Sequence, residues 1–373
     1  MRILLTNTIL GTRGGSESFV RDLARGLQAF GHSVMAYSSD PKHQERLLES
    51  DVIPVATDLE RLPFAPDVIH GQHHLDAMTA IAGLPGVPAL YHCHGAVWRE
   101  AIPAHPRIHR YLAVSRTLAE RIAIESCIPA SRITLLLNAV DMARFSCVRT
   151  PRAKPVRALF FNRRHGEHSA TLAAVREACA RHQIALDCGG RPLGPEVLHP
   201  EHTLHEYDIV FASGVSAIEA LASGCAVVVL GRTSCGELVT SENFERYRQV
   251  NFSIAVNSAP PSGENVAAQV DRFSASDAEA VTSRTRFEAD FVRSVELLLD
   301  VYRELAAVQA LIEPDLAAES RAMSAYLRRI VPLIKMTDLM LDGHWSSPTR
   351  ATSFEELRAD VASLERRLRE SAS

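Results

Sequence analysis

Short apolar segments alternate with segments of helical periodicity along most of this chain, and that alternation constrains the fold more than any other feature. A strand-length apolar run at residues 3–5 comes before a glycine-bearing turn. After the turn, Phe19, Leu23 and Leu27 recur at helical spacing. A second strand is expected at residues 33–38. A β–loop–α–β unit of this kind predicts a parallel sheet covered by helices, which is an α/β domain.

The same alternation predicts a second domain of the same kind. Further strands of the first series are expected at residues 67–70, 89–94, 111–114 and 133–137. The pattern stops in residues 147–156, where two prolines indicate a linker. Strands of the second series are expected at residues 157–161, 184–188, 208–212 and 225–230, and helices at residues 169–182 and 216–223. We therefore expect two Rossmann-like domains, residues 1–146 and 157–300, and a helical extension over residues 301–373.

Composition excludes several classes of protein. Forty Lys and Arg against forty-four Asp and Glu leave a net charge of −4, which gives no overall attraction to nucleic acid. The seven cysteines form no C-x-x-C pair, which is typical of a reduced intracellular protein. The start MRILLT is too short for a signal peptide, and no apolar run approaches a membrane span. These features predict a cytoplasmic protein, and a peripheral position at the inner face of the membrane is left open.

The turn before the first helix is a candidate phosphate site. It has the spacing G-x-x-G-G and ends at Gly14 and Gly15. Glycines at this place let the backbone approach a phosphate, and the helix that follows supplies N–H donors. The spacing lacks the G-x-G-x-x-G fingerprint, which disfavours NAD. A tight turn that only needs glycine is the alternative explanation.

A second candidate site is Glu219, expected early in a short helix that follows a strand. The amides of Gly214, Val215 and Ser216 would face an anion there, and Glu219 would accept hydrogen bonds from sugar hydroxyls. The alternative is a carboxylate that only complements the helix dipole.

Several short motifs, taken in order, resemble the family 4 glycosyltransferases of the GT-B fold. Each motif is short, but their joint order from residue 1 to about residue 231 is specific. They are Gly14-Gly15 before a helix that ends in Gly31-His32-Ser33-Val34, Asp67-Val-Ile-His70, His92-Cys-His94-Gly95, Tyr111-Leu-Ala-Val-Ser115, Leu137-Asn-Ala-Val-Asp-Met-Ala-Arg-Phe145, Asn162-Arg163-Arg164 and Glu219-Ala-Leu-Ala-Ser-Gly224.

This resemblance implies transfer of a sugar from a nucleoside diphosphate sugar to a hydroxyl acceptor, with retention and without a metal or other cofactor. The acceptor would be a glycan, a lipid-linked sugar or a protein. Glu219 would hold the ribose, and His94 would be the catalytic residue that contacts the transferred sugar. The remaining donor-binding positions implied are Gly14, Gly15, Arg163, Arg164, His168, Gly190, Gly214, Val215 and Ser216.

Two departures from the family pattern keep other functions open. Phe211 stands eight positions before Glu219, where the family has a glutamate, and His168 stands where it has a lysine. Arg164 is expected to compensate for the missing charge at residue 168. One alternative is a non-catalytic GT-B relative that acts as a binding or partner subunit. A third is a sugar-nucleotide epimerase.

Five histidines gather around two expected strand ends, at residues 70, 73, 74, 92 and 94. They lack the spacing of a zinc motif, so hydrogen bonding is favoured over metal binding. At the far end of the chain, Leu357, Val361, Leu364 and Leu368 form a heptad seam of about two heptads. This predicts a helix that packs on its own protein, with a homodimer or partner contact left open.

Overall fold

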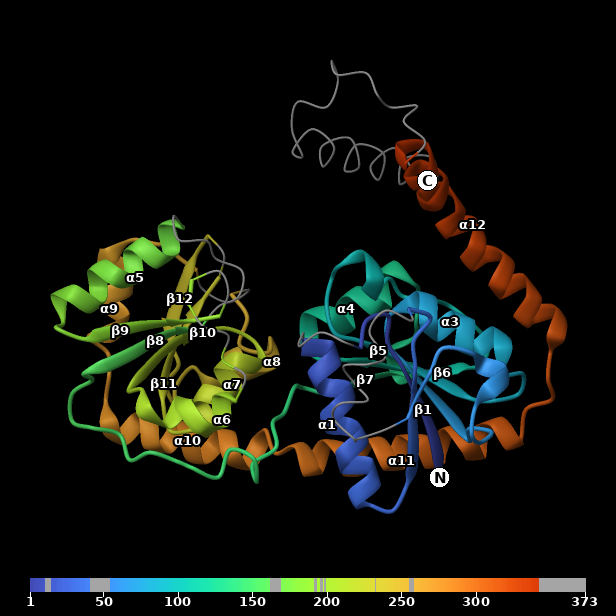
Figure 1. Ribbon diagram of the computed structural model, residues 1–373, viewed down its shortest axis with the longest axis horizontal. Coiled ribbons are helices and arrows are strands. Elements are labelled where there is room, and N and C mark those ends of the chain that lie inside the picture. The colour runs from blue at the N-terminus through green and yellow to red at the C-terminus, as the bar shows by residue number, and fades with distance from the viewer. Residues whose placement is uncertain are drawn as a thin grey trace. The chain divides into compact units, whose positions relative to one another are not determined.

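The computed structural model describes residues 1–10, 15–40, 54–161, 169–190, 193–194, 197, 199–231, 233–254 and 258–341. The chain divides into two units, one of residues Met1–Asp315 and one that begins at Leu316. Each is described by itself. The first unit holds two separate sheets, as the two expected domains require (Figure 1).

The first sheet is parallel throughout, with the strand order β3-β2-β1-β4-β5-β6-β7. Its strands are β1 (Arg2–Thr6), β2 (Ser33–Tyr37), β3 (Val55–Ala56), β4 (Val68–Gly71), β5 (Ala89–Cys93), β6 (Ile108–Ala113) and β7 (Ile133–Leu135). Its connecting helices are α1 (Gly15–Ala29), α3 (His74–Gly83) and α4 (Arg116–Glu125). Ser115 caps α4 by accepting a hydrogen bond from the Leu118 amide.

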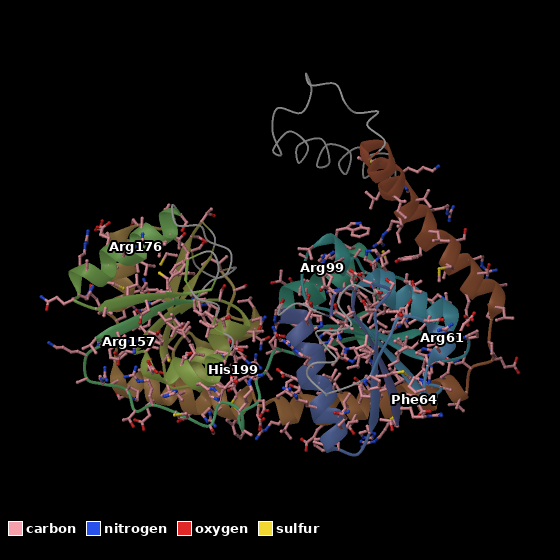
Figure 2. The ribbon with its side chains drawn as sticks, viewed as in Figure 1. Arg61, Phe64, Arg99, Arg157, Arg176 and His199 are labelled. Carbon is pink, nitrogen blue, oxygen red and sulfur yellow. The ribbon has the colours of Figure 1, made fainter. Side chains whose placement is uncertain are left out.

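The second sheet has the order β12-β11-β10-β8-β9. Its strands are β8 (Arg157–Phe161), β9 (Ala185–Gly189), β10 (Ile209–Ala212), β11 (Ala226–Leu230) and β12 (Cys235–Leu238). The helices are α5 (Ala170–Arg181), α6 (Pro200–Thr203), α7 (Val215–Ala222), α8 (Phe244–Gln249), α9 (Gly263–Val270) and α10 (Ala275–Glu288). Strand β12, which the sequence pattern does not predict, pairs with β11 in the antiparallel direction. Near the start of β8, Arg157, labelled in Figure 2, forms ion pairs with Asp187 and Glu206.

Helix α11 (Phe291–Ala310) returns to the first sheet although it follows the second in sequence. Its buried residues Val295, Leu298 and Tyr302 share one apolar core with β1, β4 and α1. Figure 1 shows α11 beside α1, and the two helices approach so closely at Gly26 that an added Cβ would lie 2.7 Å from Val295 Cγ2. The expected boundary at residue 300 falls inside this helix. We therefore propose that the second domain ends before α11.

Two chain segments run between the two sheets, and backbone hydrogen bonds at Val140 join them. The N–H of Val140 donates to the Ala289 carbonyl at 3.0 Å, and its carbonyl accepts from the Phe291 amide at 3.1 Å. The buried Arg248 guanidinium donates to the Asn138 carbonyl at 2.6 Å. Because buried backbone groups need partners, these bonds tie the outgoing segment to the returning one.

The described part of the second unit is helix α12 (Leu316–Leu341). No helix among the described residues is both long enough and apolar enough to cross a membrane. The expected heptad helix with Leu357, Val361, Leu364 and Leu368 lies outside the described residues, so its packing stays a prediction.

The return of α11 can be tested with two neighbouring leucines on that helix. Leu298 is fully buried, whereas Leu297 is 40% exposed. We expect Leu298→Ala to lower the free energy of unfolding by about 2–5 kcal/mol, because it leaves a cavity under the sheet. Leu297→Ala should change it by less than about 0.5 kcal/mol. Urea unfolding of both variants measures this, and equal effects would contradict the packing.

Candidate functional site

The carboxyl edge of the second sheet presents the amino terminus of α7. Strand β10 ends at Ala212 and α7 begins at Val215, so only two residues connect them. Gly214 has φ 63° and ψ −138°, a conformation that other residues rarely adopt, and a Cβ added there would meet open space. No hydrogen bond between described residues uses the amides of Val215 or Ser216. This helix start therefore offers two backbone donors to an anion.

The amide of Gly214 has a different role from the one expected. It donates to the Phe252 carbonyl at 3.1 Å, so it is already paired. We therefore assign Gly214 a conformational role. Only the amides of Val215 and Ser216 remain as candidate hydrogen-bond donors to a phosphate.

Glu219 lies in the second turn of α7, with a side chain that is 13% exposed. Its carboxylate is 3.6 Å from Nη2 of Arg144. The same guanidinium lies 3.3 Å from Asp22 on α1 and 3.6 Å from Glu201 on α6. Burial raises the pKa of Asp22, and the charge of Arg144 acts against that rise. The sequence did not single out Arg144 as a site residue, although the residue stands in the motif that ends Arg144-Phe145.

Phe211 does not lie where the sequence comparison placed it. Phe211 stands where the family has a glutamate, and on the sequence this departure is a sign that donor binding could be lost. Instead Phe211 is fully buried within β10 and packs with Phe160 and Val228 in the core. The reason is the two-residue connection to α7, which leaves position 211 inside the strand. Phe211 is therefore a core residue and says nothing about the loss of donor binding.

Other expected donor positions are described only in part. Gly190 follows β9 with φ 97°, and its carbonyl accepts from the amides of Leu193 and Gly194. Its role beside the base stays a prediction. Gly14, Arg163, Arg164 and His168 lie outside the described residues, so nothing in the structure places them.

The carboxyl edge of the first sheet holds His94, directly after β5. Its backbone amide donates to Oε2 of the buried Glu100 at 3.0 Å. Its Nε2 atom is buried and has no hydrogen-bond partner among the described residues. The ring of Phe19, from the first turns of α1, lies 4.9 Å from the His94 ring. Gly15 begins the same helix, and a Cβ added there would meet open space.

A row of rings leads from α11 to the half-buried His94. Tyr302 Oη and His70 Nδ1 share a hydrogen bond of 2.6 Å, and His70 Nε2 and His92 Nδ1 share one of 3.2 Å. The rings of His92 and His94 lie 4.0 Å apart. Burial lowers the pKa of His70 to about 3 and that of His94 to about 4, and it also lowers the pKa of His92 well below its ordinary value. The three imidazoles, which we call the histidine row, are therefore neutral at pH 7.

The remaining histidines of the group take part in hydrogen bonds and ring contacts. His73, with φ 54°, accepts from the Thr8 amide and lies 3.4 Å from Glu100. The ring of His74 meets that of Trp98 edge to face. Within the described ranges, no three His, Cys, Asp or Glu side chains are grouped so that they could hold a metal ion.

The sequence of the first domain matches the model of a known protein family. Residues 13–144, from the start of α1 to the segment that leaves the first sheet, match the family model described as Glycosyltransferase Family 4. This region is a Glycosyltransferase Family 4 domain. It contains the helix α1, the histidine row as far as His94, and Arg144. No curated protein sequence matches the chain.

Solved structures extend the likeness beyond the family 4 domain to both sheets. A glycosyltransferase from Rickettsia africae ESF-5 is 14% identical with a TM-score of 0.58, covering 82% of this chain and 98% of that one. The lipopolysaccharide outer core galactosyltransferase WaaB is 13% identical with a TM-score of 0.54, covering 83% and 100%. A UDP-N-acetylglucosamine 2-epimerase is 10% identical with a TM-score of 0.50, covering 80% and 94%. At these identities the likeness shows the fold, which is GT-B.

The histidine row predicts how stability depends on pH. Unfolded histidines take up protons below about pH 6.5, whereas the folded pKa values of His70 and His94 are about 3 and about 4. Stability should therefore fall as the pH drops from 6.5 towards 4, by about 1.4 kcal/mol per pH unit for each of the three groups. Urea unfolding at pH 7, 6 and 5 measures the slope.

Two variants separate the row from other histidines. His70→Leu removes one of the three groups and should make the slope about one third shallower. The hydrogen bond to Asp271 raises the pKa of His182 above 6.5, so the stabilisation from His182 is already complete below about pH 6.5. His182→Gln should therefore leave the slope below pH 6.5 unchanged. Stability that increases from pH 7 to pH 5 would contradict a neutral buried row.

Proposed function

We propose that this protein transfers a sugar from a nucleoside diphosphate sugar to the hydroxyl group of an acceptor. The observation that supports this most is the helix start at Val215, with two unused amides and Glu219 one turn later, in a chain whose first domain is of Glycosyltransferase Family 4. An anion at a helix start is stabilised by the N–H groups and by the helix dipole. The diphosphate would bind there.

Glu219 would accept hydrogen bonds from the ribose hydroxyls. Arg144 lies 3.6 Å from that carboxylate and limits the directions in which it can point. Because Arg144 also faces Asp22 and Glu201, it is held by three carboxylates. Arg144 is thus a positioning residue for the ribose contact.

In the transfer step, the bond from the anomeric carbon to the diphosphate breaks and a bond to the acceptor oxygen forms. The acceptor proton passes to the departing phosphate oxygen. Negative charge grows on the leaving group, so the amides of Val215 and Ser216 stabilise the transition state more than the ground state. We propose that the sugar keeps its anomeric configuration and that no metal is needed. His94, neutral at pH 7, would contact the transferred sugar through its unpaired Nε2.

Donor binding is the first test. We expect one of UDP, GDP, ADP or CMP, or a sugar conjugate of it, to stabilise the protein by about 2.7 kcal/mol at 100 times its dissociation constant. Glu219→Ala should then weaken binding of that nucleotide at least about tenfold, because hydrogen bonds to a charged group contribute about 1.5–3 kcal/mol. Calorimetry measures both.

Glu201→Ala is the matched control for this loss. Glu201 has nearly the same exposure as Glu219 and the same distance to Arg144, but it lies outside α7. Its replacement should leave nucleotide affinity within about threefold. A folded protein that binds no nucleotide would overturn the proposal and favour a binding or partner subunit, whereas conversion of the donor without an acceptor would favour an epimerase.

Stereochemistry and metal use are tested on the same reaction. We expect the product to have the same anomeric configuration as the donor, seen in the proton coupling constant by NMR. We also expect turnover to be unchanged after EDTA treatment, because the backbone donors at Val215 and Ser216 take the place of a cation. An inverted product, or activity that returns only with Mg²⁺ or Mn²⁺, would contradict this mechanism.

A further inference from the structure

Several buried polar atoms near His94 have no hydrogen-bond partner among the described residues. They are Nδ2 of Asn7, both Nε2 and Oε1 of Gln72, Nε2 of His92 and Nε2 of His94 itself. Asn7, Gln72 and His92 are fully buried. Unpaired polar atoms in the interior are costly and rare, so a group of them requires an explanation. We call these four residues the amide–histidine cluster.

The strand register brings the cluster together. Leu5 of β1 pairs with His70 of β4, so two residues later Asn7 lies beside Gln72. The hydroxyl of Thr6 confirms this placement, because it donates to the Gln72 carbonyl at 2.9 Å and accepts from the Gln72 amide at 3.0 Å.

The next strand adds the two histidines. Gly71 of β4 pairs with Tyr91 of β5, which places Gln72 beside His92. Side chains alternate between the faces of a strand, so Gln72 shares the face of His70, which is the face that α1 and α11 cover. The ring of Phe19 lies 4.9 Å from both His92 and His94 and closes the cluster on the side of α1.

The chemistry of these groups selects one class of ligand. A primary amide both donates and accepts hydrogen bonds, and a neutral imidazole has one nitrogen of each kind, which matches hydroxyl groups. The cluster contains no lysine or arginine. The carboxylates of Glu17 and Glu100 both act electrostatically on His94, and both side chains are buried. A phosphate or carboxylate placed here would be repelled by the carboxylates of Glu17 and Glu100.

We propose that the amide–histidine cluster binds the hydroxyl groups of a neutral sugar ring and rejects acidic sugars. Gln72 and Asn7 are its specificity-determining residues. This inference rests on the proposed function, since it concerns the sugar that such an enzyme would handle. The ring belongs either to the transferred sugar or to the acceptor, and the experiment distinguishes these two sources.

The first measurement needs no ligand. Gln72→Leu replaces an unpaired buried amide by an apolar side chain of similar size, so the urea midpoint should stay the same or rise. Gln269→Leu is the matched control, because Oε1 of Gln269 accepts from the Leu238 amide at 3.0 Å, and its midpoint should fall. A fall for Gln72→Leu as large as that for Gln269→Leu would overturn the proposal, since Gln72 would then be paired within the protein.

The second measurement compares neutral and acidic rings by calorimetry. The donor arm uses UDP, UDP-glucose and UDP-glucuronic acid, with GDP and GDP-mannose if the protein prefers guanine. If the ring is the transferred sugar, Gln72→Leu should weaken the neutral nucleotide sugar at least tenfold and leave the free nucleotide unchanged. The acidic nucleotide sugar should bind the unaltered protein no more tightly than the free nucleotide.

The acceptor arm uses saturation-transfer NMR in the presence of the nucleotide, with methyl glycosides of glucose, galactose and mannose and with methyl glucuronide. If the ring is the acceptor, a neutral glycoside should bind, the glucuronide should not, and Gln72→Leu should abolish the signal. Absence of all nucleotide binding would overturn the proposed function itself. This inference alone would be overturned if the protein binds a nucleotide and a neutral ring and Gln72→Leu leaves the binding of that ring unchanged in both arms. That result is expected for a cluster that holds only water.

Discussion

The packing of α11 on the first sheet is the contact on which the rest of the first domain depends. It completes the core between β1, β4 and α1 and brings Tyr302 to His70. Because His70 is thereby held inside the core, His92 and His94 follow at the edge as neutral rings. His70 thus stays neutral because it is buried beside Tyr302, 232 residues away in sequence, and not because of any local motif.

In the second sheet, the edge at which we propose that the donor binds depends on a different constraint, the length of the connection between β10 and α7. Two residues between β10 and α7 place the helix start directly at the strand end, and Gly214 supplies the conformation that this turn requires. The same shortness keeps Phe211 inside the strand. One local geometry therefore places Phe211 in the core and puts the amides of Val215 and Ser216, the proposed hydrogen-bond donors to an anion, at the strand end.

Much of the fold is predictable from periodicity. The alternation of strands and helices predicts two parallel sheets, and most of the expected strands lie within a few residues of their observed bounds. Strand β12 could not be foreseen, because a four-residue segment with a glycine carries no periodic signal. By the family pattern, Phe211 is a site position because it lies eight residues before Glu219. That spacing does not account for the short connection between β10 and α7, which leaves Phe211 inside the strand.

The sequence by itself determined the fold class and the identity of Glu219 and His94 as candidates, because strand ends and helix starts follow from local patterns. Only the tertiary structure decided how these residues are charged and what surrounds them. Arg144 meets Glu219 and Asp22 from distant parts of the chain. Strand register brings Asn7 and Gln72 together, and among the described residues Nδ2 of Asn7 and the side-chain amide of Gln72 have no hydrogen-bond partner. Burial and electrostatic contact depend on neighbours in space, which no pattern along one strand specifies.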